Sequence, residues 1–302
     1  MTSNSTIKVF ALVGLGNIGA ALADEVIKAG YQLRILSRDA QNNSKLAEFG
    51  ERGASLVSVD YSSDESLRNA LSGTDVILST LNAVSGEAVQ VHVARLGREV
   101  GVKVLFTNQW GSDYVAPKIA RAPMFPAIVD KVKQLEQVTQ TGMPWISVAN
   151  GLFGSWALSP YFGFDANGKT VTWPGNTEQL FSLTHPNDIG RFVVQIIRTQ
   201  PIPAPGTGRW YRVEGFRASY KDIFAELQRQ DGPWTILSTS IDNVKASQTR
   251  PGPMGLVAWL QACFDDGRAL LDTNDNQLVG FTPKYGLQYS IKDSLAELKR
   301  NA

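Results

Sequence analysis

Three glycines near the N-terminus have the spacing of a phosphate-binding turn. They follow an apolar run at residues 9–13 and precede a helical pattern at residues 20–29. In such a turn the first glycine permits a tight bend, the second lets the backbone approach an anion, and the third lets the helix pack close to the strand. The N–H groups at the start of the helix then face phosphate, so the pattern predicts a bound dinucleotide. The candidate cofactor contacts are Gly14, Gly16, Asn17, Ile18 and Gly19.

The second strand pattern, residues 31–36, ends in Ser37 and Arg38 rather than in an acidic residue. A carboxylate at this point binds the ribose 2′-hydroxyl of NAD, whereas an arginine can hold the 2′-phosphate of NADPH. Lys45 adds positive charge nearby, and Asp39 is the competing residue one position further on. We therefore expect NADPH (NADP) as the cofactor, with Arg38 and Lys45 near its 2′-phosphate. The alternative is that Arg38 is a solvated loop charge.

A regular framework must position these residues, and apolar runs alternate with helical patterns through the first half of the chain. Strands are expected at residues 9–13, 31–36, 55–59, 75–80, 103–106 and 145–149, and helices at residues 20–29, 64–71, 86–100 and 125–141. This alternation predicts an α/β fold, a Rossmann-type doubly wound parallel sheet with helices on both faces.

Two domains are expected from the change of composition at Asn150, after which aromatic residues, glycine and proline become dense. Residues 1–150 are the predicted NADP-binding domain, and residues 151–302 are a smaller C-terminal substrate lobe. Residues from about 181 to 198 are a candidate to pack back on the first domain. Residues 231–257 show no regular pattern.

Composition argues against several kinds of partner and site. The 302 residues are 43% hydrophobic and 19% charged, and the formal net charge of +1 gives no reason to expect nucleic acid or an anionic membrane as a partner. The single cysteine, Cys263, excludes an internal disulfide, and the two histidines are too distant in sequence to suggest a metal site. No leader or membrane-spanning pattern is visible. We expect a cytoplasmic monomer or homodimer that acts on a small molecule.

Further segments resemble a known family. Residues 75–80 resemble its fourth strand, and residues 105–113 stand where the family has a Phe-Pro-Ser-Glu-Phe-Gly-like segment. Lys131 lies eleven residues ahead of the Gly-Met-Pro at residues 142–144, which is similar to the family's lysine-containing helix and Gly-Ile-Pro-like turn. With the glycine turn and the arginine, these segments resemble the isoflavone-reductase-like branch of the NmrA-like atypical short-chain dehydrogenase/reductases, over roughly residues 7–198. That branch includes phenylcoumaran benzylic ether and pinoresinol–lariciresinol reductases.

The resemblance implies an NADPH-dependent oxidoreductase of secondary metabolism that transfers hydride to a small aromatic or conjugated carbonyl-type metabolite. Lys131 corresponds to the family's active-site lysine, which contacts the nicotinamide ribose and acts as proton donor or oxyanion stabiliser. A solvated helix charge is the alternative for this residue. Thr80 and Asn108 lie in matched segments and are expected to contact the cofactor. Residues 107–110 depart from the family's Pro-Ser-Glu-Phe stretch, which leaves the substrate open.

Three residues after the sixth strand are candidates for binding the substrate. Asn150, Phe153 and Trp156 follow that strand at the carboxyl edge, where ligands bind in such sheets. Flat side chains suit an apolar cleft over the nicotinamide. Ordinary packing is the alternative for both aromatic residues. For His185, a contact to substrate or cofactor and a structural role both remain open.

Tyr114 and Lys118 have the Tyr-x-x-x-Lys spacing of ordinary short-chain dehydrogenases. That spacing works by placing both side chains on one face of a helix. Pro117 disfavours the helix that this arrangement needs. We therefore interpret the match as chance, with Tyr114 as a possible wall of the pocket.

A second functional class stays open beside the reductase. An NmrA-type regulator would sense NAD(P) and bind a protein partner without catalysis. Lys131 in its matching context favours the enzyme, and no basic or strongly apolar segment supports a protein partner.

Overall fold

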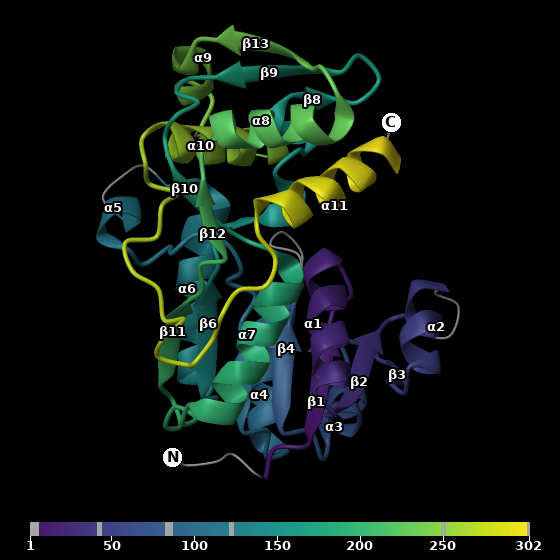
Figure 1. Cartoon of the computed structure of the whole chain (residues 1–302). Helices are drawn as coiled ribbons and strands as arrows, with labels where there is room; N and C mark the ends of the chain where they lie inside the picture. Colours follow the sequence, from purple (N-terminus) through teal and green to yellow (C-terminus); the bar gives the residue numbers. More distant parts are fainter. Residues whose placement is uncertain are drawn as a thin grey trace.

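A parallel β-sheet forms the centre of the molecule. The computed structural model describes residues 6–40, 44–81, 87–120, 124–248, 250 and 252–300. Within them, seven parallel strands pair in the order β11-β6-β5-β4-β1-β2-β3 (Figure 1). Their bounds are β1 Val9–Val13, β2 Gln32–Ser37, β3 Ser55–Ser58, β4 Val76–Ser79, β5 Val104–Phe106, β6 Trp145–Ala149 and β11 Gly208–Arg212. The predicted Rossmann-type sheet is confirmed.

Alternate residues of the central strands face opposite layers of the fold. In β1, Phe10 and Leu12 join the hydrophobic core on one face, and Ala11 and Val13 join the core on the other. Every residue of β4 is buried because both faces are covered, which explains its uninterrupted apolar pattern. Each large apolar side chain buried in this way stabilises the fold by roughly 1.5–3 kcal/mol.

Helices cover both faces of this sheet (Figure 1). Their bounds are α1 Asn17–Lys28, α2 Ser44–Glu51, α3 Asp64–Leu71, α4 Glu87–Glu99, α6 Pro126–Gln140 and α7 Pro186–Thr199, whereas the short α5 Pro117–Ala120 buries Ile119 in a separate hydrophobic cluster. α1 packs against α7 on one face, whereas α4 contacts both α3 and α6 on the other. At the carboxyl edge of the sheet, Thr80 after β4 contacts Gly14 after β1, and Asn108 after β5 contacts Lys131 of α6.

A second group of elements lies over this carboxyl edge (Figure 1). Within the described ranges, two three-stranded sheets have the orders β12-β10-β7 and β13-β9-β8. The strands are β7 Leu152–Phe153, β8 Phe164–Asp165, β9 Thr170–Pro174, β10 Phe181–Thr184, β12 Phe216–Ala218 and β13 Thr235–Thr239. The helices are α8 Tyr220–Asp231, α9 Ile241–Lys245, α10 Pro253–Asp265 and α11 Leu287–Arg300. Ring contacts among Trp173, Phe181, Tyr220 and Phe264 form the centre of this group.

The expectation of irregular structure at residues 231–257 is wrong. β13 pairs in parallel with β9, and α9 follows it directly. All five side chains of β13 are exposed, so no alternation of apolar and polar residues marks the strand. Backbone pairing to β9 holds it instead.

The sequence patterns also did not predict β11. It pairs with β6 as the edge strand of the main sheet, to which it adds a segment of the second half of the chain. A Cβ on Gly208 would lie 1.9 Å from the Trp145 ring, so the glycine permits this pairing. In the part of the chain that the structure describes, no helix is both long enough and apolar enough to cross a membrane.

Candidate active site

The glycine turn occupies the crevice between the carboxyl ends of β1 and β4, where the strand order reverses. Gly14 has a φ of +94°, and a Cβ there would lie 3.1 Å from the Thr80 carbonyl oxygen. A Cβ on Gly19 would lie 2.7 Å from both the Gly14 carbonyl oxygen and Thr80 Oγ1. The packing of the protein itself therefore requires these two glycines.

Gly16 differs from the other two glycines of the turn. A Cβ at this position would meet no other described residue within 4 Å, and its φ of −94° is open to any residue. Gly16 is also the N-cap of α1 and has no side chain to accept hydrogen bonds from the first helical turn. Open space beside unpaired N–H groups at the positive end of a helix fits a pyrophosphate.

Thr80 and Asn17 are held at this crevice by hydrogen bonds. Thr80 Oγ1 donates to the Gly14 carbonyl at 2.7 Å, which links the ends of β4 and β1. Asn17 is exposed, and its Nδ2 donates to Glu297 of α11 at 3.2 Å. Ile18 is half-buried against the core under α7.

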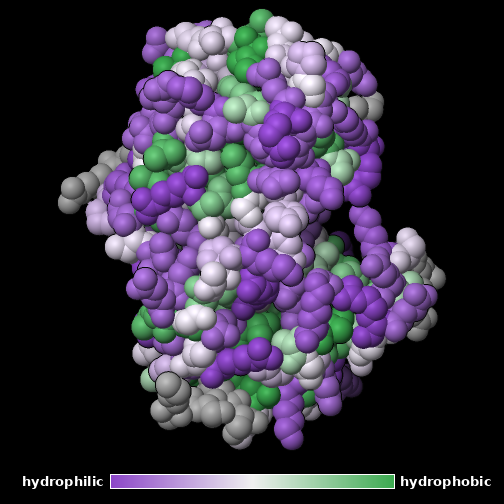
Figure 2. All heavy atoms as spheres, viewed as in Figure 1, coloured by the Kyte–Doolittle hydropathy of each residue, from purple (hydrophilic) through white to green (hydrophobic). Residues whose placement is uncertain are grey.

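A cleft of about 490 Å³ leads to the start of α1. Figure 2 shows the surface hollowed between the upper group of elements and the part formed by α2. The cleft is lined by residues of α1, of the end of α2 and the position after it, of the start of α7 and of α11, and they include Asn17, Asp24, Phe49, Arg52, Asp293 and Glu297. The first turn of α1 is therefore reached from solvent on this side.

Arg38 follows β2 directly and is exposed at the same edge of the sheet. Its charge acts on the neighbouring Tyr61, although burial dominates and raises the pKa of that phenol. Tyr61 donates to the Leu36 carbonyl at 2.8 Å, which ties the segment after β3 to the end of β2. Lys45 is exposed in the first turn of α2, the next element along the chain.

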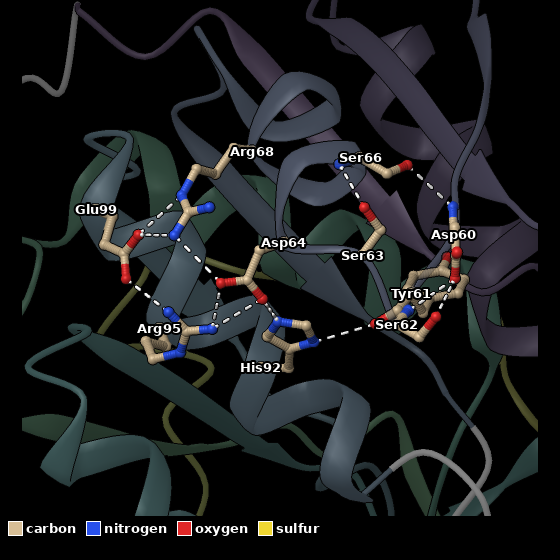
Figure 3. Close-up of polar contacts among 10 residues, drawn as sticks. All are labelled: Asp60, Tyr61, Ser62, Ser63, Asp64, Ser66, Arg68, His92, Arg95 and Glu99. Carbon is tan, nitrogen blue, oxygen red and sulfur yellow. Dashed lines mark hydrogen bonds and ion pairs between the residues drawn. The ribbon is translucent and has the colours of Figure 1, made fainter.

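An ion-pair cluster supports this end of the crevice (Figure 3). The Asp64 carboxylate, in the first turn of α3, pairs with Arg95 at 3.0 Å and with His92 Nε2 at 2.6 Å. His92 Nδ1 lies 3.0 Å from the Tyr61 carbonyl oxygen. Glu99 joins Arg95 on α4 to Arg68 on α3. The cluster therefore fixes the segment that carries Tyr61 against α4.

The cluster predicts a dependence of stability on pH. Hydrogen bonds from Arg95 and then His92 lower the pKa of Asp64 to about 2. Because this pKa is lower than in the unfolded chain, the stabilisation is present above about pH 4 and is lost as the pH falls toward about 2. Asp64→Asn should lower the melting temperature at neutral pH, and the difference from the wild type should shrink below about pH 4. Thermal melts over this range test it, with the exposed neighbour Glu65→Gln as control. A difference that stays constant with pH contradicts the assignment.

Lys131 lies on α6 and is only 8% exposed. Its Nζ donates to the Asn108 carbonyl at 2.9 Å, and the Asn108 N–H donates to Gln90 Oε1 at 2.7 Å. Gln109 Nε2 donates to the Lys131 carbonyl at 2.6 Å. Lys131 is thus a buried ammonium held against the segment after β5, and not a solvated helix charge. Gln90 is not among the residues predicted from the sequence for this site, whereas Gln109 lies in the matched segment 105–113.

Two buried oxygen atoms near Lys131 have no hydrogen-bond partner among the described residues. They are Asn108 Oδ1 and Gln109 Oε1. Leaving a buried polar atom unpaired costs about 1–3 kcal/mol, so such atoms need a partner. Both belong to residues that hydrogen-bond to Lys131, through the Asn108 carbonyl and the Gln109 amide nitrogen.

A cavity of about 190 Å³ opens beside Lys131. Its apolar wall is formed by Trp110, Tyr114, Ile128, Leu152, Phe153, Trp156, Leu256, Trp259, Leu260 and Phe264. Phe153 and Trp156 meet edge to face with centroids 6.0 Å apart. Such a lining selects a flat, apolar ligand.

Asn150 has a different place from the other two substrate candidates. Its Oδ1 accepts from the Gly111 N–H at 2.9 Å, and its Nδ2 donates to the Gly151 carbonyl at 2.9 Å. The side chain is fully buried and holds the ends of β5 and β6 together. It does not line the described cavity, whereas Gly111 and Gly151 do.

Two other side chains singled out in the sequence have structural partners. His185 caps α7 by accepting from the Asn187 N–H, and its Nε2 pairs with Asp293 at 2.9 Å. Lys118 pairs with Asp272 at 2.8 Å, whereas Tyr114 lies in the turn before α5. Tyr114 and Lys118 therefore do not share a helix, which agrees with the interpretation of their spacing as chance.

Comparison with solved structures shows relatives of this fold. A leucoanthocyanidin reductase from Vitis vinifera in complex with NADPH superposes with a TM-score of 0.77 at 15% identity, covering 95% of this chain and 99% of that one. A triphenylmethane reductase from Citrobacter sp. complexed with NADP(H) gives a TM-score of 0.71 at 15% identity, covering 95% and 99%. At this level of identity the likeness shows the fold.

Comparison of sequences shows the family. A bifunctional pinoresinol-lariciresinol reductase 2 from Linum usitatissimum is 26% identical over 207 residues, 63% of this chain and 62% of the relative. A phenylcoumaran benzylic ether reductase, Pyrc5 from Pyrus communis, is 28% identical over 202 residues, 63% of this chain and 64% of the relative. The chain thus matches less than two thirds of the length of these relatives. The NmrA-like family model matches residues 3–223, and the chain belongs to the NmrA-like family.

Proposed function

We propose that this protein is an NADPH-dependent reductase that transfers hydride to a small aromatic or conjugated carbonyl-type metabolite. One observation carries the proposal: the buried ammonium of Lys131 stands where the dinucleotide-binding edge of the sheet meets an aromatic-lined cavity. The relatives named above are reductases, and the two structural neighbours hold NADPH or NADP(H). Both observations support the hypothesis of an NADPH-dependent reductase.

The cofactor would lie along the carboxyl edge of the sheet. The space over Gly16 and the N–H groups of α1 would hold the pyrophosphate, and Arg38 with Lys45 would hold the 2′-phosphate. Thr80, which links the carboxyl ends of β4 and β1, would lie between the two halves of the cofactor. The side-chain amide oxygen of Asn108, which has no partner among the described residues, would contact the nicotinamide half. When bound, NADPH supplies the hydride.

Lys131 would act on the oxygen of the substrate. Its Nζ is positioned by the Asn108 carbonyl, and Lys131 lines a cavity whose other walls are mostly apolar. A fixed positive charge in such surroundings stabilises a developing oxyanion strongly, because little solvent screens it. The ammonium can also give a proton to that oxygen.

The proposal is tested by NADPH oxidation with a panel of enones, quinones and phenolic compounds. We expect turnover of at least one flat, neutral member, because the cavity offers aromatic walls and one ammonium. Tight NADPH binding with no turnover on any member would contradict the reductase and favour the regulator that binds cofactor without chemistry.

Cofactor preference gives a separate prediction for Arg38. Arg38→Ala should weaken NADPH binding by about 1.5–3 kcal/mol, or roughly 10- to 150-fold, because a charge-assisted contact to the 2′-phosphate is lost. NADH affinity should barely change. Calorimetric titration with both cofactors measures this, and Arg229→Ala, an exposed arginine on α8, is the control. Equal losses for NADPH and NADH would show that Arg38 does not read the 2′-phosphate.

A further inference from the structure

The hydroxyl group of Tyr114 lies at the carboxyl edge of the sheet. A Cβ built on Gly111 would be 2.5 Å from Tyr114 Oη, so the phenol oxygen sits directly over this glycine. Gly111 itself bridges to Ala149 at the end of β6, and its N–H is held by Asn150. The phenol oxygen therefore stands above the junction of β5 and β6, where ligands bind in such sheets.

The ring of Tyr114 faces the ammonium of Lys131. Lys131 Nζ lies 5.7 Å from the ring centroid, and both residues line the 190 Å³ cavity. Most of the other lining residues are apolar, and the indole N–H of Trp110 already donates to the Ser79 carbonyl at 2.9 Å. Tyr114 and Lys131 are thus two proton-bearing groups on one small cavity.

The surroundings of Tyr114 keep its hydroxyl protonated. The side chain is almost completely buried, and burial raises the pKa of the phenol, while a hydrogen bond that the phenol oxygen accepts from the Ser112 backbone offsets part of this effect. At neutral pH the group is consequently a hydrogen-bond donor. The nearby ammonium would stabilise a phenolate formed transiently by loss of the proton.

We propose that Tyr114 is a second catalytic residue, which donates a hydrogen bond to the substrate oxygen and gives it a proton during reduction. Hydride from NADPH forms the new C–H bond, the π electrons of the substrate move to oxygen, and the Tyr114 proton forms the new O–H bond. Water returns a proton to the phenolate after product leaves. Lys131 then acts mainly by holding the charge on both oxygen atoms. This inference rests on the proposed reductase function.

Tyr114→Phe tests the proposal, because it removes only the hydroxyl and keeps the ring. We expect single-turnover hydride transfer to fall by about 100-fold or more, with NADPH affinity and melting temperature close to those of the wild type. Tyr211→Phe is the matched control, since Tyr211 is a buried phenol of β11 whose hydroxyl has no partner among the described residues. It should transfer hydride at the wild-type rate. A Tyr114→Phe rate within about threefold of the wild type overturns the proposal.

A binding measurement separates this proposal from the reductase function. The 4-nitrophenolate ion is a flat ring with an oxyanion, and its absorption shifts when the oxygen accepts a hydrogen bond. In the presence of NADP⁺ we expect the wild type and Tyr211→Phe to bind it, and Tyr114→Phe to bind it about tenfold more weakly. Unchanged binding by Tyr114→Phe, or no binding by the wild type, overturns the role of Tyr114. If 4-nitrophenolate binding depends on Tyr114 as predicted but no compound of the substrate panel is reduced, the reductase proposal fails. The role of Tyr114 as a hydrogen-bond donor would then still hold.

Discussion

Lys131→Ala is expected to reduce turnover by about 10²–10⁴-fold while NADPH affinity stays within about tenfold of the wild type. The ammonium is buried on the wall of the cavity and is oriented by the Asn108 carbonyl, so its removal takes away the positive charge on which the proposed reduction depends. The phosphates of the cofactor would be held at the other end of the crevice by the glycine turn and Arg38. Stopped-flow hydride transfer and calorimetric titration measure the two quantities separately.

Lys133→Ala is the matched control for this variant. Lys133 lies two residues further along α6 and is exposed, so its loss should leave both rate and affinity nearly unchanged. Slow hydride transfer by Lys133→Ala would show that the reacting group lies on a different face of α6 from Lys131. If neither variant is impaired, the lysine mechanism is wrong.

Gly16→Val should abolish most cofactor binding and leave the fold intact. The valine side chain would enter the space over the turn, where a Cβ would meet no other described residue within 4 Å. The backbone at Gly16 has a negative φ, so valine causes no strain there. The same substitution at Gly19 would meet backbone and side-chain atoms at 2.7 Å and would test folding instead.

Gly286→Val is the control for Gly16→Val. A Cβ on Gly286 also meets nothing within 4 Å among the described residues, and this glycine immediately precedes α11. Circular dichroism and thermal melting should show folded protein for both variants, and titration with NADPH should separate them. Wild-type affinity in Gly16→Val would mean that the turn is structural and that no dinucleotide binds over it.

Local patterns in the sequence were sufficient for the framework of the main sheet. β1 and β4 are continuous apolar runs because helices cover both of their faces, and the glycine turn is encoded in residues that adjoin in the chain. The strands from β1 to β6 were therefore predictable, since each depends mainly on its own composition and on the breaks that follow it.

Elements held by distant contacts were not predictable in this way. β13 is fully exposed and exists because it pairs with β9, and α2 shows its amphipathic pattern over only eight residues. β11 reaches the main sheet only because Gly208 fits against the Trp145 ring, a contact between distant parts of the chain.

The residues of the candidate site also divide into those that local sequence indicates and those that only tertiary packing brings together. Sequence analysis proposed Lys131, Phe153 and Trp156, and the structure brings all three to one cavity. It did not propose Gln90 or Trp259, which come from α4 and α10 and meet the site only through tertiary packing. No local signal distinguishes these side chains from ordinary core residues. Asn150 follows β6 as expected, but its amide is used to hold Gly111 and Gly151.

The central claim is that this chain moves hydride from NADPH to a small-molecule substrate. NADPH carrying deuterium at both C4 positions, mixed with wild-type protein and the best substrate of the panel, tests it most directly. Mass spectrometry should find one carbon-bound deuterium in each product molecule for each NADPH oxidised. A product without carbon-bound deuterium, or bound NADPH that is never oxidised by any substrate of the panel, would contradict the account.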